Sequence, residues 1–417
     1  MGKVLLLITT EYPFGGITER TFISPELKYL SERFSQILII PEKSGEQNFS
    51  CKFQNIIVDD CRIKSTSPIS KWLKVRFAVN PYIARLLYNE RSKIKSLRQV
   101  LNTIAYGINI LHFKHDMPRL IRRRELNPCD SLFYTFWFDF RTDGLALMNK
   151  TGNWHIITRA HGYDIYDRTF RPYHTRAYTL SKIDKVYAAS RNGADYITNK
   201  YPYYSDKITT STLGSIKYFP DKLSLDNDRY NVITFFSCAR IAPEKRVHLN
   251  LEFLIAFAQS YPDKEVRWIH VGNGPLADDI TRLISKGIPD NLKIEIKGAQ
   301  PNSVVHDIYI SETIDWTLLF SSSEGGLPIT ICESLSYGVP VIATMVGGIP
   351  EIINSYNGIL LSKNPTATEF ITKIKPYIND PAKHRQLKHN TYQYWQEHLN
   401  ADTLRCQFAD IISDFAK

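Results

Sequence analysis

Residues 321–351 read SSSEGGLPITICESLSYGVPVIATMVGGIPE, and this stretch does more than any other to define the fold of the 417-residue chain. A short apolar run at 316–320 leads into it and is typical of a buried strand. The pattern then predicts an apolar helix at 330–337 and a second buried strand at 339–343. Strand, glycine loop, helix and strand in this order form the repeating unit of a parallel sheet covered by helices.

The same alternation recurs along the rest of the chain. Further strands are predicted at 4–9, 36–40, 131–137, 154–158, 185–189, 232–237, 266–271 and 292–296, and helices at 21–34, 248–260, 276–286 and 303–311. A polar segment at 213–229 separates two halves, each long enough for its own core. We therefore predict an α/β protein with an N-terminal domain at 1–213, a linker at 214–230, a C-terminal domain at 231–395 and a last helix at 396–417.

Composition and termini indicate a globular protein of a reducing compartment. The six cysteines, at 51, 61, 129, 238, 332 and 406, form no Cys-x-x-Cys pair and have no histidine at zinc-ligand spacing. The first ten residues, MGKVLLLITT, have an apolar core too short for a signal peptide or a membrane span. We expect a cytoplasmic protein whose first residues form a buried strand.

Positive charge is concentrated in one segment. Residues 62–124 contain 15 lysines and arginines and two acidic residues, which leaves the rest of the chain near −3 out of a total of +10. Because apolar residues alternate with these charges, the segment could bind an anionic membrane surface or a phosphate-rich ligand. The alternative is an ordinary solvated helix face. No zinc finger, recognition helix or RNA-binding motif accompanies the charge, so nucleic acid is not an expected partner.

The glycine loop before the predicted helix at 330–337 is suited to an anion. The amides of Gly325, Gly326 and Leu327 would lie at the helix N-terminus, where backbone N–H groups and the helix dipole favour a phosphate. Glu333, about one turn into the helix, could accept hydrogen bonds from two vicinal hydroxyls such as those of a ribose. The alternative is plain turn chemistry at a strand–helix junction.

Taken together, these residues resemble the retaining glycosyltransferases of the GT-B fold, family four (glycosyl transferases group 1). That family carries Glu-x7-Glu, then Gly-x-Pro-Val-Ile, then Gly-Gly-x-x-Glu, and the last two motifs match residues 338–342 and 347–351. The resemblance implies two Rossmann-like doubly wound domains that face a central cleft, with the last helix crossing back to the N-terminal domain. Glu324 and Glu333 are nine positions apart rather than eight, so Gly325 occupies the register of the first glutamate. Either the Glu324 side chain or the Gly325 backbone would meet the donor sugar.

The segment CARIAPEKR at 238–246 places Arg240 and Lys245 five positions apart after a predicted strand. The resemblance implies that this pair grips the donor diphosphate. Two cations held at a strand end would stabilise the negative charge of a leaving nucleoside diphosphate and make a metal unnecessary. The alternative is a surface loop with a salt bridge.

Two features of the N-terminal half also match the family. Gly16 follows the first strand, where the family's backbone approaches the phosphate and the acceptor. Arg159 to Asp164 read RAHGYD, similar to the family's Arg-x-His-Gly-x-Asp. The resemblance implies that His161 hydrogen-bonds the donor sugar, while Asp164 orients it or closes the turn. A histidine at the carboxyl end of a strand, beside glycine, is favoured for such a role over a core position.

The resemblance implies a hexosyltransferase-type enzyme (EC 2.4) that moves a sugar from a nucleoside-diphosphate sugar to a glycan or lipid-linked acceptor with retention. Catalysis would depend on His161, Arg240 and Lys245, with no metal and no cofactor besides the donor. The pathway expected is bacterial surface polysaccharide synthesis, on the inner face of the cell membrane. The Asp-Asn-Asp at 226–228 is interpreted as a solvated turn. The alternatives are a sugar-nucleotide epimerase of the same fold and a catalytically silent sugar-nucleotide-binding protein.

Overall fold

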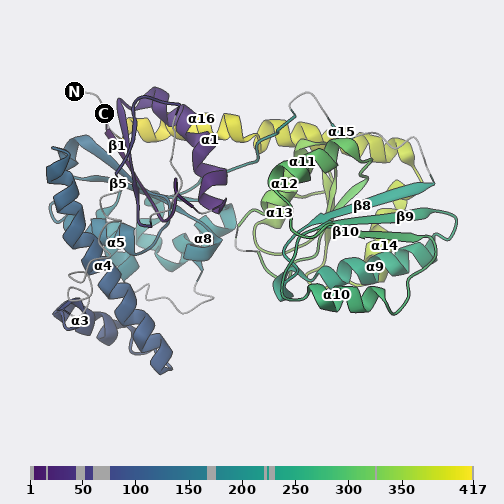
Figure 1. The fold of residues 1–417 in the computed structure, drawn as a ribbon, viewed down its shortest axis with the longest axis horizontal. Helices are drawn as coiled ribbons and strands as arrows, with labels where there is room; N and C mark the ends of the chain where they lie inside the picture. The colour runs from purple at the N-terminus through teal and green to yellow at the C-terminus, as the bar shows by residue number, and fades with distance from the viewer. Residues whose placement is uncertain are drawn as a thin grey trace. The chain divides into compact units, whose positions relative to one another are not determined.

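The computed structural model describes residues 4–15, 17–43, 52–59, 76–166, 175–219, 223–224, 231–324 and 326–415 (Figure 1). The chain divides into two compact units, Met1–Ser211 with Arg405–Lys417, and Thr212–Leu404. We call them the N-terminal and the C-terminal domain. Among the described residues, no helix combines the length and the apolar character needed to cross a membrane.

The N-terminal domain is built on a seven-stranded sheet in which all neighbours are parallel. Its elements are β1 (Val4–Thr9), α1 (Ile17–Arg33), β2 (Gln36–Pro41), β3 (Ile56–Val58), α3 (Pro81–Glu90), α4 (Leu97–Arg123), β4 (Ser131–Thr135), α5 (Phe140–Met148), β5 (His155–Ala160), α6 (Gly162–Ile165), α7 (Arg176–Lys182), β6 (Lys185–Ala188), α8 (Arg191–Lys200) and β7 (Ile208–Thr210). The strand order β3-β2-β1-β4-β5-β6-β7 reverses direction between β1 and β4. Ligands of doubly wound sheets bind beside such a reversal, outside the carboxyl ends of the strands.

The C-terminal domain is a six-stranded parallel sheet of order β10-β9-β8-β11-β12-β13. Its elements are β8 (Val232–Cys238), α9 (Val247–Ser260), β9 (Glu265–Val271), α10 (Ala277–Ile284), β10 (Leu292–Ile296), α11 (Asn302–Ser311), β11 (Trp316–Leu319), α12 (Ile329–Ser336), β12 (Val341–Thr344), α13 (Ile349–Ile352), β13 (Gly358–Leu361), α14 (Ala367–Ile378) and α15 (Pro381–His398). This is the strand order of the Rossmann fold, and its reversal lies between β8 and β11. The prediction of two doubly wound parallel domains is confirmed.

The strands are continuous apolar runs because helices cover both faces of each sheet. β1 reads VLLLIT and is buried over Leu5 to Thr9, and β11 reads WTLL and is buried throughout. The sequence analysis missed β3, β7 and β13, which have three, three and four residues. Such short runs show too little periodicity to be separated from loops.

The last helix, α16 (Ala401–Asp414), adds residues to the core of the N-terminal domain. Phe408, Ala409 and Ile412 are buried among side chains of β1, α1 and β4. The guanidinium of Arg33, at the end of α1, donates to Asp410 Oδ1 at 2.8 Å, and α16 lies beside α1 in Figure 1. The core of the first 211 residues therefore includes side chains from the last eleven described positions.

A buried ion pair joins these elements. Arg159 of β5 and Glu26 of α1 are each 2% exposed, with Nη2 and Oε2 2.8 Å apart. Arg159 Nε also donates to the Tyr134 hydroxyl at 2.7 Å, and its guanidinium carbon lies 3.8 Å from the ring centroid of Phe408. Arg159 thus belongs to the core, although it is the first residue of the RAHGYD motif.

We expect Glu26→Ala to lower the free energy of unfolding by about 3–5 kcal/mol, because it leaves the Arg159 guanidinium buried without its counter-ion. Glu32→Ala is the matched control, since Glu32 pairs with Arg33 at a 57%-exposed surface position. Its effect should stay below about 1 kcal/mol. Urea denaturation of the two variants checks this, and equal losses would contradict a stabilising role for the buried pair.

Candidate active site

The loops that follow β8 and β11 lie beside each other at the strand-order reversal of the C-terminal domain. The Ser322 amide donates to the Glu244 carbonyl at 2.8 Å. Arg246 adopts the left-handed conformation (φ 47°) and donates to the carbonyl oxygens of Phe320 and Ser321 at 2.7 and 2.9 Å. The two loops are therefore held together by the backbone and by one guanidinium, which the sequence analysis did not single out.

Lys245 and Glu324 come from these two loops and form an ion pair. Lys245 Nζ donates to Glu324 Oε1, and the side chains are only 23% and 11% exposed. The structure thus brings together two residues that are 79 positions apart in the sequence. A half-buried ammonium at this end of the sheet is well placed to meet a phosphate.

Arg240, by contrast, lies at the surface. Its side chain is 65% exposed and donates to Glu244 Oε1 at 2.8 Å, a hydrogen bond that lowers the pKa of Glu244. This is the surface salt bridge that the sequence analysis gave as the alternative. A pair as exposed as this one is weak, so the guanidinium can leave Glu244 for a ligand at little cost.

The glycine loop runs from Glu324 into α12. Gly325 lies outside the described residues. At Gly347, which has a φ of +55°, a side-chain Cβ would lie 2.3 Å from the Glu324 carbonyl oxygen. A Cβ on Gly348 would lie 2.9 Å from Leu327 Cδ2 and 3.1 Å from the Gly326 carbonyl oxygen. The second glycine pair therefore lets another stretch of backbone pack directly against Glu324, Gly326 and Leu327.

The N-terminus of α12 carries no side-chain cap. Pro328 is its N-cap residue and supplies no side-chain hydrogen bond. The Thr330 hydroxyl instead donates to the Cys238 carbonyl at 3.0 Å, which fixes the first turn of α12 to the end of β8. Amides in the first turn of a helix that lacks a side-chain cap are available to an anion.

Glu333 is buried in α12, with 5% of its surface exposed. Its Oε1 accepts a hydrogen bond of 2.8 Å from Asn302 Nδ2. Burial raises the pKa of Glu333 to about 7, although the hydrogen bond from Asn302 lowers it. The carboxyl group therefore titrates near neutral pH.

In the N-terminal domain, Glu19 organises the loop after β1. Its carboxylate accepts hydrogen bonds from the amides of Thr10, Glu11 and Tyr12 at 2.7–2.8 Å, and from Trp137 Nε1 at 2.6 Å. Burial acts to raise the pKa of Glu19, but these four hydrogen bonds outweigh it and lower the pKa. The Glu19 carboxylate therefore stays ionised and holds the backbone of the loop after β1. Gly16, predicted to approach the donor here, lies outside the described residues.

His161 follows β5 and is packed against aromatic rings. Its ring centroid lies 4.8 Å from that of Phe136 and 4.7 Å from that of Trp137. Both ring nitrogens are buried, and neither has a hydrogen-bond partner among the described residues. Because buried polar atoms are nearly always paired, the imidazole of His161 is a candidate for contact with a ligand.

Asp164 closes the turn that carries His161. Its Oδ1 accepts from the His161 amide at 2.5 Å and its Oδ2 from the Phe138 amide at 2.8 Å, whereas His161 Nδ1 is 3.9 Å from Oδ2. The carboxylate therefore fixes the backbone on both sides of the imidazole. The sequence left two roles open for Asp164, orienting His161 or closing the turn, and the geometry favours closing the turn.

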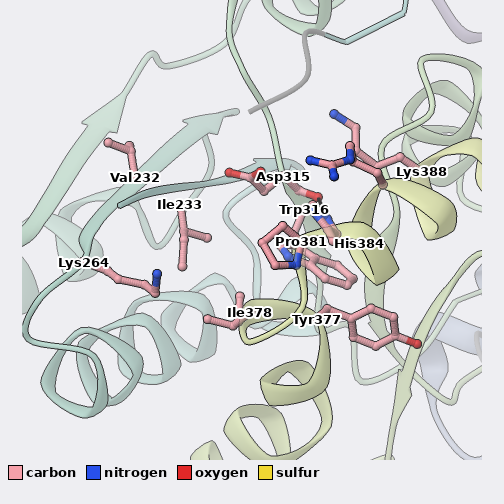
Figure 2. Close-up of a pocket in the computed structure, with 11 residues that line it drawn as sticks. Val232, Ile233, Lys264, Asp315, Trp316, Tyr377, Ile378, Pro381, His384 and Lys388 are labelled. Atoms are coloured by element: carbon pink, nitrogen blue, oxygen red, sulfur yellow. Dashed lines mark hydrogen bonds between the residues drawn. The ribbon is translucent and has the colours of Figure 1, made fainter. Parts of the chain in front are cut away.

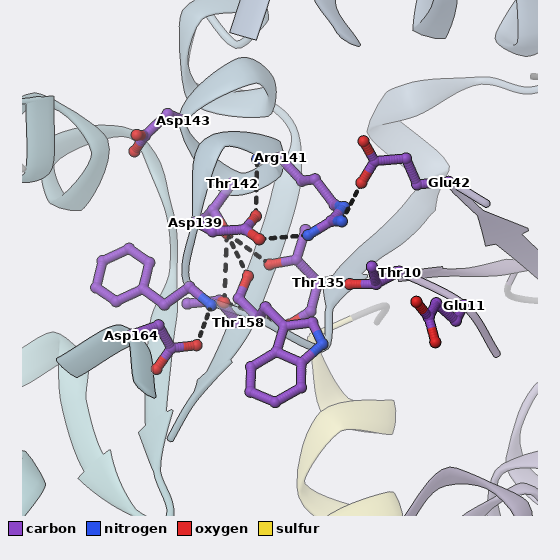
Figure 3. A network of polar contacts seen from close by, with 12 residues as sticks. Thr10, Glu11, Glu42, Thr135, Asp139, Arg141, Thr142, Asp143, Thr158 and Asp164 are labelled. Atoms are coloured by element: carbon purple, nitrogen blue, oxygen red, sulfur yellow. Dashed lines mark hydrogen bonds and ion pairs between the residues drawn. The ribbon is translucent and has the colours of Figure 1, made fainter. Parts of the chain in front are cut away.

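A cavity of about 390 Å³ opens at the carboxyl ends of β1, β4 and β5. It is lined by Thr10, Glu11, Glu19, Trp137, Asp139, Phe140, Arg141, Tyr163 and Asp164. Figure 3 shows the Arg141 guanidinium reaching between Asp139 and Glu42, and it pairs with both carboxylates. Burial raises the pKa of Asp139 to about 6 against the effect of Arg141. The lining combines aromatic rings with more acidic than basic groups.

Sequence reasoning missed Trp137, Asp139 and Arg141. The predicted strand at 131–137 ran two residues too far and placed Trp137 inside the sheet, whereas β4 ends at Thr135. When β4 is taken to end at Thr135, the three residues follow it directly, at the reversal of strand order between β1 and β4. That position is the signal that could have identified them.

A cavity of about 60 Å³ lies in the C-terminal domain, at the end of its sheet opposite to the loops of Lys245 and Glu324 (Figure 2). Val232 and Ile233 at the start of β8, and Asp315 and Trp316 at the start of β11, contribute to its lining. It holds a few water molecules at most and lies at the amino ends of the strands. The site is therefore assigned to the carboxyl ends.

No cluster of three or more histidine, cysteine, aspartate or glutamate side chains suited to a metal ion occurs within the described ranges. The Asp-Asn-Asp at 226–228 lies outside them.

Residues 225–394 match the protein family described as glycosyl transferases group 1. The C-terminal domain is thus similar in sequence to the glycosyltransferases (EC 2.4) of this family. The match covers β8 to α15, and so includes Arg240, Lys245, Glu324 and Glu333.

A sequence relative of the group 1 domain is a phosphatidylinositol N-acetylglucosaminyltransferase protein of Arabidopsis thaliana, 28% identical over 162 residues. This match covers 38% of the chain and 35% of that protein, so the chain spans about a third of that relative's length.

Two solved structures show the fold over the whole chain. Anabaena HepE in complex with UDP is 16% identical, with a TM-score of 0.61, and the match covers 99% of this chain and 100% of that one. The lipopolysaccharide outer core galactosyltransferase WaaB is 14% identical, with a TM-score of 0.66 and 99% coverage of both chains. The expected GT-B fold is confirmed.

We expect Gly347→Ala to destabilise the C-terminal domain more than Gly298→Ala does. Both glycines have a left-handed φ, of +55° and +65°, so alanine costs about 1–2 kcal/mol at either position. Only at Gly347 does the new Cβ meet the Glu324 carbonyl oxygen, because nothing lies within 4 Å at Gly298. The clash should add about 1–3 kcal/mol. Chemical denaturation measures both variants, and equal destabilisation would mean that residues 324–327 do not depend on this packing.

Proposed function

We propose that the protein transfers a sugar from a nucleoside-diphosphate sugar to an acceptor hydroxyl, with retention at the anomeric carbon. The observation that carries the proposal is the arrangement at the β8–β11 reversal. There the loop of Lys245, the loop of Glu324 and the uncapped start of α12 meet, within a domain of a sugar-transferring family. Lys245 and the α12 amides suit a diphosphate, and the buried Glu333 suits a ribose.

On this proposal, the donor diphosphate binds the amides of Gly326 and Leu327 and the cations Lys245 and Arg240. Lys245 is already held by Glu324, so it needs little reorganisation to meet a developing negative charge. When the phosphate takes over the ammonium, Glu324 becomes free to accept a hydrogen bond from the sugar. Arg240 adds its charge by leaving Glu244. The two cations stabilise the leaving nucleoside diphosphate without a metal.

The N-terminal cavity is proposed to take the acceptor. Trp137, Phe140 and Tyr163 offer aromatic faces for a sugar ring, and Glu11 and Asp139 can accept hydrogen bonds from hydroxyls. The excess of carboxylates disfavours a phosphate or uronate inside the cavity, because like charges repel. The acceptor end is therefore proposed to be a neutral sugar of a glycan or lipid-linked glycan. His161 is proposed to donate to the donor sugar through one unpaired nitrogen.

The proposed mechanism is a front-face displacement, in which the leaving phosphate of the donor acts as the base. As the bond from the anomeric carbon to the phosphate oxygen breaks, that oxygen takes the proton of the acceptor hydroxyl. The hydroxyl oxygen then forms the new bond on the face that the phosphate leaves. Retention follows, because attack and departure occur on one face of the sugar.

The test is to incubate the protein with a panel of nucleotide sugars and membrane extract and to measure nucleoside diphosphate release. Release should fall by at least 100-fold in Arg240→Ala or Lys245→Ala, because each loses a cation at the leaving group. Arg282→Ala is the matched control, since Arg282 is an exposed arginine paired with Asp279. No release with any donor would refute the transferase. Conversion of the sugar to its epimer without release would indicate an epimerase, and nucleotide binding without turnover would indicate a silent binding protein.

The helices α3 and α4 support a further part of the proposal, attachment to the inner face of a bacterial membrane. They pack together where Gly107 of α4 receives Ile83 and Leu86 of α3. Apolar side chains nevertheless point to solvent from this pair, with Val79, Tyr88, Leu97 and Leu101 between 57% and 79% exposed. Arginines and lysines surround them in the sequence, and residues 62–75 of the basic segment lie outside the described residues. Exposed apolar groups among cations are typical of surfaces that bind anionic lipid headgroups.

We expect the protein to sediment with vesicles of anionic phosphatidylglycerol and to be released at high ionic strength, because salt screens the attraction. Replacing Leu97 and Leu101 by serine should weaken binding about tenfold or more, since two apolar anchors are lost. Tyr203→Ser is the control, because Tyr203 is 86% exposed elsewhere in the same domain. Binding that is indifferent to salt, or equal in all three proteins, would contradict the docking surface.

A further inference from the structure

We propose that Asn302, His306 and Tyr337 form a chain of hydrogen bonds that positions the Glu333 carboxylate to receive the ribose hydroxyls of the donor. The inference rests on the proposed function, since it concerns how the donor site recognises its nucleotide. The sequence analysis named none of the three residues as a candidate site residue. They are positioning residues, because they act through Glu333.

The geometry of the chain is continuous. Asn302 Nδ2 lies 2.8 Å from Glu333 Oε1, and Asn302 Oδ1 lies 3.1 Å from His306 Nε2. His306 Nδ1 lies 2.8 Å from the Tyr337 hydroxyl oxygen. Asn302 and His306 are four positions apart on α11 and therefore project from the same face of that helix. Tyr337 directly follows α12, the helix of Glu333.

The direction of every hydrogen bond follows from its ends. An ionised carboxylate only accepts, so the Asn302 amide nitrogen donates to Glu333, and the Asn302 carbonyl oxygen must accept from His306 Nε2–H. His306 Nδ1 is then the unprotonated nitrogen and accepts from the Tyr337 hydroxyl. Burial lowers the pKa of His306 to about 4, which keeps the imidazole neutral and the direction fixed. The Tyr218 ring covers His306, with centroids 4.3 Å apart.

The chain occupies one side of the carboxylate. Glu333 Oε1 accepts from Asn302, whereas Oε2 receives no hydrogen bond from any residue that the structure describes. No lysine or arginine of the described ranges lies within ion-pair distance of Glu333, and His306 Nε2 lies 3.8 Å from Oε1. A buried carboxylate that is fixed at one oxygen and unpaired at the other is suited to accept ligand hydroxyls.

The groups that face Glu333 from neighbouring elements are neutral at pH 7. Burial raises the pKa of Cys238 at the end of β8, of Cys332 in α12 and of Tyr337 to about 12 in each case. Burial also raises the pKa of Tyr309 in α11 well above its usual value. Titration between pH 6 and pH 8 near this site is therefore that of Glu333 itself, whose pKa lies at about 7.

The sign of the pH effect follows. Ionised Glu333 accepts two hydroxyls and protonated Glu333 does not, so recognition of the ribose is present above pH 7 and is lost below it. The hydrogen bond from Asn302 lowers the pKa of Glu333 and so extends recognition to lower pH. Removing Asn302 should raise the pKa and move the loss of recognition to higher pH.

The experiment compares UDP with 2′-deoxy-UDP by isothermal titration from pH 5.5 to pH 9, with the ADP and GDP pairs as further probes. The dissociation constant of 2′-deoxy-UDP divided by that of UDP measures the contribution of the 2′-hydroxyl, because the titration of the phosphates affects both constants equally. In the wild type the ratio should be high at pH 8 and fall with a midpoint near 7. Asn302→Ala should move the midpoint to higher pH and reduce the ratio at pH 7 by about tenfold. Asn390→Ala on α15, whose side chain accepts from Gln386, is the control and should leave the ratio unchanged.

Tyr337→Phe is the second variant, because it removes one hydroxyl oxygen and keeps the buried ring. It should move the midpoint in the same direction by a smaller amount. A wild type that discriminates against 2′-deoxy-UDP, with the same midpoint in Asn302→Ala and Tyr337→Phe, overturns the positioning role and leaves the transferase intact. A wild type that binds UDP and 2′-deoxy-UDP equally also overturns it. A wild type that binds no nucleoside diphosphate overturns the donor site itself.

Discussion

The guanidinium of Arg246 bonds to two consecutive carbonyls of the loop after β11, while its own backbone begins α9 in a left-handed conformation. Lys245 comes immediately before it and Glu324 lies three residues beyond Ser321, so their ion pair depends on this bridge between the loops. The glycine pair at 347–348 then packs against the same loop. Arg246 acts with the hydrogen bond from the Ser322 amide to Glu244 and the one from the Thr330 hydroxyl to Cys238, and together these contacts fix the lysine, the glutamate and the uncapped helix relative to one another.

The two domains place opposite chemistry at the same topological position. Each sheet reverses its strand order beside its first strand, and each reversal carries a group of polar residues. In the C-terminal domain these are cations and uncapped amides, which suit a diphosphate. In the N-terminal domain they are mainly carboxylates and aromatic rings, which suit a neutral sugar. One architecture thus presents an anion site and a carbohydrate site, and loop residues alone make the difference.

Sequence reasoning predicted the architecture well, because strands buried on both faces and helices of period 3.6 have strong patterns. It also identified Glu333, Lys245 and His161 as candidates, since motif spacing depends on local geometry. It could not predict the Lys245–Glu324 pair, which joins positions 79 apart, because only the fold brings those loops together. The hydrogen bonds from Tyr337 to Glu333 could not be predicted for the same reason, because they connect residues of α11 with residues of α12 and its end. Arg159 shows the converse, since a residue inside a motif proved to be part of the core.

The residues that complete the N-terminal core are not contiguous in the chain. Phe408 packs against Arg159 from α16, which is synthesised only after the whole C-terminal domain. During translation, 193 residues of the other domain are synthesised after the first 211 residues and before α16. Until then, Arg159 lacks its contact with the Phe408 ring. The C-terminal domain is formed by one continuous segment of the chain and can fold as a unit once that segment has emerged. Completion of the N-terminal domain in this way depends on the emergence of α16.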